Sequence, residues 1–208
     1  MRNVLRVWGG TLVVGVLLLQ GAVWAMLSPM QQVKETTDAV LQVVTDEGLD
    51  RDAKRARITD LLKDGFDFRT MSKLTLGLNW KKATPAEQER FVDLFTEVLK
   101  WTYITRIEDY SGETVEYGEE RMTKKNRAEV ETFIVTTNST RIPISYKVHL
   151  SDDKWRAYDV VIEGVSLIRN YRGNYREIVK RDGFDGLFAL MEEKIERLEQ
   201  AKKGTDQA

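Results

Sequence analysis

The side chains that most often carry catalysis or bind metals are scarce in this sequence. The chain has 208 residues, no cysteine and a single histidine, His149. A thiol nucleophile and every cysteine-containing metal site are therefore excluded. One histidine without cysteine also disfavours a zinc site, and no nucleophile elbow, phosphate-binding glycine loop or calcium-loop spacing is present. We expect His149 on the solvated face of a strand, the face that also carries Lys147.

Two carboxylates near the end of one predicted strand are the best candidates for acid–base chemistry. Asp159 and Glu163 are expected on the same face of that strand, and paired carboxylates can act as general acid and base. The alternative, which we favour, is that they form structural ion pairs with Arg156, Arg169 or Arg172. Asp159 is nevertheless the acid that an enzymatic function would use.

Helical patterns dominate the first half of the chain. Apolar residues recur at helical spacing over 30–45 and 52–63, and Gly65 is expected to end the second helix in a left-handed conformation. A short helix is expected over 66–78. The segment 84–87, Thr-Pro-Ala-Glu, is a capping box with proline in the first turn, and it predicts the start of a long helix.

From about residue 114 the apolar period changes from 3.6 to 2, the period of half-buried strands. Four strands with short turns between them are expected, over 114–118, 127–137, 141–150 and 155–163. A sharp turn at Gly164 and two helices, over 170–180 and 184–202, follow. The sequence therefore predicts an α+β fold, a twisted antiparallel sheet of about four strands whose apolar face is covered by helices.

The N-terminal segment has the composition of a secretory signal peptide. Arg2 and Arg6 precede an uncharged stretch, and a small-residue cleavage site ends at Ala25. An uncleaved membrane anchor is the alternative, but glycines dilute the apolar run. The predicted organisation has three parts: 1–25 as signal peptide, 26–202 as a single domain and 203–208 as a polar tail.

The charge balance and the absence of cysteine limit which partners and which cellular compartment the chain fits. The 32 basic and 33 acidic residues give a formal net charge of -1, and loss of Arg2 and Arg6 would make the chain slightly more acidic. Such a chain is not built to bind nucleic acid. An exported chain without a lipobox cysteine or disulfides fits the periplasm of a Gram-negative cell.

Several short blocks of the sequence resemble the MlaC family of periplasmic phospholipid carriers, also known as toluene-tolerance proteins. In the family's order, the blocks are Phe66-Asp67 with Met71; Trp80 to Pro85 with Gln88, Phe91, Phe95 and Tyr103; Ile142-Pro143-Ile144 with Tyr146; Trp155, Tyr158-Asp159-Val160, Glu163 to Leu167 and Asn170-Tyr171-Arg172; and Gly183 to Leu187. The N-terminal third of the chain and the region 113–125 match poorly.

The resemblance implies a periplasmic carrier that binds phospholipid as cargo and needs no cofactor. It would exchange lipid between an outer-membrane lipoprotein complex and an inner-membrane ABC transporter with an MCE-domain protein, and so maintain outer-membrane lipid asymmetry. It also implies an apolar lipid cavity between the sheet and the helices. Two other functions stay open: a ligand-free adaptor of a membrane transport complex, and a secreted hydrolase or isomerase that uses Asp159.

A lipid carrier must enclose the acyl tails. At about 0.8 kcal/mol per methylene, a lipid with roughly thirty methylenes costs on the order of 25 kcal/mol to expose to water. The residues expected to line the cavity are Phe68, Met71, Leu74, Leu78, Phe91, Leu94, Phe95, Val98, Val160, Ile162, Val165, Leu167, Leu187 and Met191. Three arginines are expected at the pocket mouth or on a partner surface: Arg169, Arg172 and Arg176.

Overall fold

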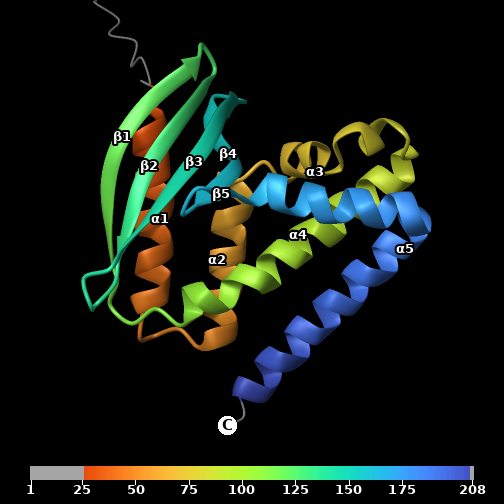
Figure 1. Cartoon of the computed structure of the whole chain (residues 1–208). Helices are drawn as coiled ribbons and strands as arrows, with labels where there is room; N and C mark the ends of the chain where they lie inside the picture. Colours follow the sequence, from red (N-terminus) through yellow and green to blue (C-terminus); the bar gives the residue numbers. More distant parts are fainter. Residues whose placement is uncertain (1–25, 207–208) are drawn as a thin grey trace, which may run out of the picture.

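The computed structural model describes residues 26–206, so the predicted signal peptide, 1–25, and the end of the predicted tail lie outside the described residues. The elements follow one another as α1 (Pro29–Thr45), α2 (Arg51–Gly65), α3 (Phe68–Leu76), the 3-10 helix η1 (Gly77–Lys81), α4 (Pro85–Glu108), β1 (Thr114–Lys124), β2 (Arg127–Val135), β3 (Arg141–Ser151), β4 (Lys154–Ile162), β5 (Val165–Ser166) and α5 (Leu167–Asp206) (Figure 1). None of the helices within this range combines the length and apolar character needed to cross a membrane.

The five strands form one antiparallel sheet in which the spatial order equals the chain order, β1-β2-β3-β4-β5. The α+β prediction and the meander of strands are therefore confirmed. The expected count of about four strands omits β5, which is only two residues long. β5 exists because Glu163 and Gly164 both adopt positive φ, 49° and 82°, and turn the chain back along β4.

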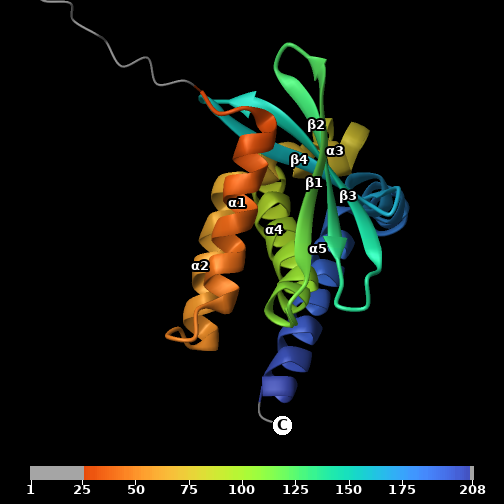
Figure 2. The same ribbon diagram turned by 90° about the vertical axis from the view of Figure 1, so that its left-hand side faces the viewer.

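The helices lie against one face of the sheet. α1 packs against the sheet, α2 packs beside α1, and α4 contacts α2 and α5 (Figures 1 and 2). Side-chain caps fix where the longest of these helices begin. Thr84 accepts from the backbone N–H of Glu87, whose carboxylate accepts from the Thr84 N–H, as the sequence predicts, and Ser28 and Gln31 form the same box at α1.

The predicted left-handed stop at Gly65 is wrong. Gly65 is the last helical residue of α2, and Phe66 follows in an extended conformation with φ −120°. The chain leaves the helix there because it pairs with β4: Phe66 forms a parallel bridge with Ala157, and the Asp67 N–H donates to the Ala157 carbonyl at 2.9 Å.

The two helices predicted after the sheet are the two arms of α5. They meet at Gly183, whose φ of 70° and ψ of −168° are not helical, and the arms diverge sharply from that residue (Figure 1). Both arms pack on α3 and α4 to form a solid apolar cluster, here called the helical core. Its buried members are Met71, Leu76, Phe91, Phe95, Val98, Leu99, Ile168, Tyr171, Tyr175, Leu187, Phe188 and Met191.

Candidate functional site

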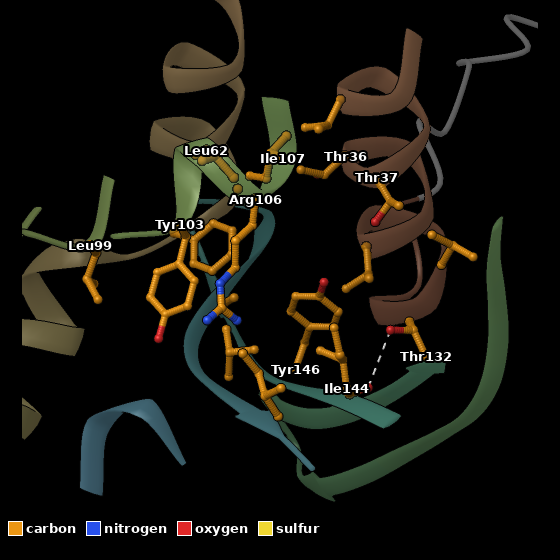
Figure 3. A pocket seen from close by; sticks show the side chains of 18 of the residues that line it. Thr36, Thr37, Leu62, Leu99, Tyr103, Arg106, Ile107, Thr132, Ile144 and Tyr146 are labelled. Carbon is orange, nitrogen blue, oxygen red and sulfur yellow. Dashed lines mark hydrogen bonds between the residues drawn. The ribbon is translucent and has the colours of Figure 1, made fainter. Parts of the chain in front are cut away.

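A pocket of about 490 Å3 lies between the sheet and helices α1, α2 and α4 (Figure 3), and we call it the main pocket. Most of the side chains on its wall are apolar. Representative members are Val33, Val40, Leu41 and Val44 of α1, Leu62 of α2, Leu99, Tyr103 and Ile107 of α4, and Ile134, Ile142, Ile144, Tyr146 and Val160 of the sheet. The pocket lies between the sheet and the helices, where the resemblance to the MlaC family implies a cavity; that lipid fills it stays a prediction.

The sheet side of the wall follows from the period of two in β3. Ile142, Ile144, Tyr146 and Val148 alternate with outward residues, and all four line the pocket. In Figure 3 the ring of Tyr146 and the aliphatic side chain of Ile144 lie opposite the side chains of α4. This face is the one that the sequence assigns to the apolar side of the strand.

A β-bulge extends the apolar wall along β4. Lys147 pairs with Asp159 and Val148 pairs with Ala157, so Tyr158 is an extra residue in β4. The extra residue shifts the alternation by one position. As a result Ala157 before the bulge and Val160 after it both line the pocket, while Asp159 does not. The irregularity is not visible in the residue types of the strand.

The helical side of the wall comes largely from the N-terminal third of the chain. Thr36, Thr37, Val40 and Val44 line the pocket at the spacing of one face of α1, and Leu62 lines it from α2. The apolar spacing of the sequence predicts these helices but does not assign them to the cavity. The signal that identifies them is the helical spacing itself, because the blocks that resemble MlaC begin only at Phe66.

The structure divides the apolar residues predicted to line a cavity into three groups. Those that line the main pocket are Phe68, Met71, Val160, Ile162 and Leu167. Those that pack in or against the helical core, outside the pocket wall, are Leu74, Phe91, Leu94, Phe95, Val98, Leu187 and Met191. Those left exposed are Leu78 and Val165. All four predicted residues of α4 thus pack in or against the helical core, whereas other residues of the same helix, such as Leu99 and Tyr103, line the pocket, and spacing alone does not separate the two sets.

None of the three predicted arginines lines the main pocket. Arg172 and Arg176 line a separate groove between η1 and the first arm of α5, together with Lys82 and Lys180. The Arg172 Nε donates to the Leu74 carbonyl at 2.7 Å and so ties this arm to α3. Arg169 is exposed at the start of α5. As partner contacts these residues stay predictions.

Asp159 is buried, and its carboxylate is fixed by hydrogen bonds from neighbouring residues. Its carboxylate accepts from the Ser166 hydroxyl at 2.8 Å, the Ile168 N–H at 3.2 Å and Lys147 Nζ at 3.1 Å. The predicted arginine partners are therefore wrong. The carboxylate joins β3 and β4 to the first turn of α5, whereas Glu163 lies exposed in the adjacent turn.

His149 is not the solvated residue that its strand position predicts. Its side chain is only 16% exposed, and its Nε2 lies 2.9 Å from Oδ2 of Asp67, the residue that caps α3. Burial favours a higher pKa for Asp67, but hydrogen bonds from the Thr70 N–H and hydroxyl, with the charge of His149, outweigh it and lower that pKa. Within residues 26–206, no group of three or more His, Cys, Asp or Glu side chains is placed to hold a metal ion.

Two phenols of the main pocket, those of Tyr103 and Tyr146, have a raised pKa and are neutral over the ordinary pH range. Burial raises the pKa of Tyr146, and burial with the nearby Tyr171 raises the pKa of Tyr103 against the opposing charge of Arg106. Within the part of the chain that the structure describes, the charged residues on the wall are Lys63, Lys100, Arg106 and Glu113. An enclosure of this kind is chemically suited to hold a large apolar ligand with a polar end at its edge.

The family model described as MlaC protein matches residues 34–193. Among curated proteins, the chain is 22% identical over 105 residues to toluene tolerance protein ttg2D of Pseudomonas putida and 24% identical over 122 residues to the intermembrane phospholipid transport system binding protein MlaC of Haemophilus influenzae. These stretches are 50% and 57% of this chain and 49% and 57% of the relatives, so the chain spans about half the length of the curated relatives it matches.

A solved structure shares the fold. The phospholipid-binding protein from Ralstonia solanacearum, determined in complex with a phospholipid, superposes with a TM-score of 0.75 at 24% identity. The likeness covers 83% of this chain and 99% of that one. Since the family model spans most of the chain, from α1 to the second arm of α5, the protein belongs to the MlaC family.

Proposed function

We propose that this protein binds a phospholipid, with the acyl tails in the main pocket and the headgroup at its edge. The observation that carries the proposal is the apolar pocket of about 490 Å3 between the sheet and the helices, in a chain of the MlaC family. Its volume lies in the range of ligand-binding sites, about 300 to 1,000 Å3. The phospholipid named for the Ralstonia protein, which has the same fold, supports the same class of ligand.

Packing energetics support an occupied pocket. An unfilled cavity costs about 24 cal/mol per Å3, so a dry pocket of this volume would cost on the order of 12 kcal/mol. That figure is comparable to the whole stability of a domain, about 5 to 15 kcal/mol. We therefore infer that lipid tails act as part of the core when bound, and that the empty pocket takes in water or narrows.

The proposed lipid contacts differ from those expected from the sequence. From the expected set we keep the residues that line the pocket, Phe68, Met71, Val160, Ile162 and Leu167. To these we add side chains of α1, α4 and the sheet, namely Val40, Leu41, Tyr103, Ile107, Ile134, Ile144 and Tyr146. The expected residues of the helical core are proposed to support the pocket rather than to touch lipid.

We propose that the bound lipid is exchanged between membranes across the periplasm. The names of the two curated relatives, an intermembrane phospholipid transport binding protein and a toluene tolerance protein, support this role. The partners would be an outer-membrane lipoprotein complex and an inner-membrane ABC transporter with an MCE-domain protein, and the result would be outer-membrane lipid asymmetry. The segment 1–25 would act as the signal peptide and 26–202 as the single domain. Arg172 and Arg176, in the basic groove beside η1, are the proposed contacts with a partner.

A binding function without catalysis is the proposal that best fits Asp159. The acid that an enzyme would use already accepts hydrogen bonds from Ser166 and Ile168, is paired with Lys147, and lies off the pocket wall. An adaptor without ligand is disfavoured because the pocket is larger than a folding core needs.

Lipid uptake by two matched variants tests the proposal. Val40 and Val43 are half-buried valines three residues apart on α1, and only Val40 lines the main pocket. Val40→Trp fills the pocket and is expected to lower phospholipid uptake from vesicles by roughly tenfold, since overpacking costs about 1 to 3 kcal/mol. Val43→Trp is the control and should keep uptake near that of the parent. Equal uptake by both variants would place the lipid elsewhere.

A further inference from the structure

One cation of the main pocket, Arg106, reaches over its apolar wall. Arg106 projects from the last turn of α4, and its guanidinium lies between the rings of Tyr103 and Tyr146, on the way to the sheet (Figure 3). Its Cζ lies 6.0 Å from the centroid of the Tyr103 ring. Among the described residues, no Asp or Glu oxygen is placed within salt-bridge distance of it. Arg106 is also exposed, so it stands at the mouth rather than in the depth of the pocket.

The other charges of the wall are placed differently. Lys100 forms an ion pair with Glu97 and lies over the Trp101 ring. The carboxylate of Glu113 accepts hydrogen bonds from the N–H and hydroxyl of Ser111, and the hydrogen bond from the Ser111 backbone is the main cause of its lowered pKa. Lys63 lies exposed on α2. The guanidinium of Arg106, by contrast, extends toward the sheet across the space that a ligand would fill (Figure 3).

A guanidinium in this position favours a particular ligand chemistry. It has five N–H donors in a planar fork that matches two oxygens of a phosphate, and it is more weakly hydrated than an ammonium group. The neutral phenol of Tyr103 lies beside it and adds a donor without adding negative charge. Charge-assisted hydrogen bonds of this kind gain strength at the edge of an apolar enclosure, where water is partly excluded.

We propose that Arg106 binds the phosphodiester of the lipid headgroup and so fixes the polar end of the cargo at the mouth of the main pocket. The inference rests on the proposed function and adds to it the residue that binds the headgroup. Recognition of the headgroup is thus assigned to an arginine on α4, in place of the arginines of α5 that were expected from the sequence.

Comparison of a phospholipid with a neutral lipid of the same tails tests this assignment. The probes are acyl-labelled phosphatidylglycerol and the diacylglycerol with identical chains, and the measured quantity is the ratio of their dissociation constants. Arg106→Gln is expected to weaken phosphatidylglycerol binding by about tenfold, the value of one charged hydrogen bond, and to leave diacylglycerol binding unchanged. Arg106→Lys keeps the charge but lacks the planar fork, so its dissociation constant for phosphatidylglycerol should lie between those of the parent protein and Arg106→Gln. Arg197→Gln, an exposed arginine on the second arm of α5, is the matched control.

The outcomes separate this inference from the proposed function. An unchanged ratio in Arg106→Gln, or an equal loss for both lipids, would overturn the role of Arg106 while lipid binding itself stands. A parent protein that binds neither lipid would overturn the proposed function. Millimolar glycerol 3-phosphate is expected not to displace the lipid, because the tails supply most of the affinity; displacement would assign the site to free phosphate and contradict a headgroup site.

Discussion

Asp159 joins three elements through one buried carboxylate, so its substitution separates a structural role from a catalytic one. Asp159→Asn weakens the bonds from Ser166, Ile168 and Lys147, and we expect a loss of about 1 to 3 kcal/mol in the free energy of unfolding. Urea unfolding measures this loss. Lipid uptake by the folded protein should not change, and Glu163→Gln, in the exposed turn nearby, should leave stability as it is. An Asp159→Asn protein of unchanged stability would contradict the structural role.

The contact between Asp67 and His149 makes part of the stability depend on pH. The folded-state pKa of Asp67 is lowered, so the stability that it contributes is present above the ordinary carboxyl pKa, about 4, and is lost as the pH falls through the folded value. Asp67→Asn keeps a cap for α3 but removes the charge, and it is expected to cost about 1 kcal/mol at pH 7.

The difference between parent and Asp67→Asn, followed by thermal unfolding across this range, should vanish at the acidic end. Asp64→Asn is the control because its ion pair with Lys154 is solvent-exposed, and exposed pairs contribute little. A constant difference at every pH would show that the charge of Asp67 does not matter.

Single residues were predictable from sequence where the cause is local. Gly164 adopts positive φ, as the sharp turn requires, and the Thr84 cap lies at the expected helix start. His149 and Arg106 were not predictable in the same way. The partner of His149 is Asp67, distant in sequence, and Arg106 is distinguished from other surface arginines only by the pocket beside it.

At the scale of elements, substitution of two glycines of α5 by alanine is expected to change the stability of the protein in opposite directions. Gly183 has φ 70° and ψ −168°, a region open almost only to glycine, so Gly183→Ala is expected to cost about 1 to 3 kcal/mol. Gly173 is helical, and a Cβ there would meet open space. Gly173→Ala is therefore expected to stabilise the protein by about 0.4 to 1 kcal/mol. Chemical unfolding of the two variants measures both signs; a neutral Gly183→Ala would mean that the two arms of α5 rejoin as one helix.

The elements themselves were largely predictable, but their division between core and pocket was not. Helical spacing predicts α1 and α4, and the period of two predicts β3 with its inward face. The cavity prediction includes Phe95 of α4 and omits Tyr103, yet Phe95 packs in the helical core and Tyr103 lines the pocket. The bulge at Tyr158 depends on the pairing of β4 with β3, which no single strand encodes.

For the whole molecule, the proposed binding of lipid in the main pocket predicts a change in stability. If tails complete the core, lipid at about one hundred times its dissociation constant adds roughly 2.7 kcal/mol to the free energy of unfolding. In a chain of this size that raises the thermal midpoint by about 5 to 10 °C. Calorimetry of lipid-loaded and delipidated protein measures the shift. Val40→Trp fills the pocket with its own side chain and should show a smaller shift in thermal midpoint. Equal midpoints for lipid-loaded and delipidated parent protein would contradict the idea that lipid acts as part of the core.

The central claim is that the main pocket carries a phospholipid. Native mass spectrometry of residues 26–208, purified from a bacterial periplasm without detergent, tests it most directly. We predict adducts of phospholipid mass, identified by extraction, that are retained in Val43→Trp and depleted in Val40→Trp. A single unadducted mass in the parent protein, with no lipid in the extract and none taken up from vesicles, would contradict the claim and favour the ligand-free adaptor.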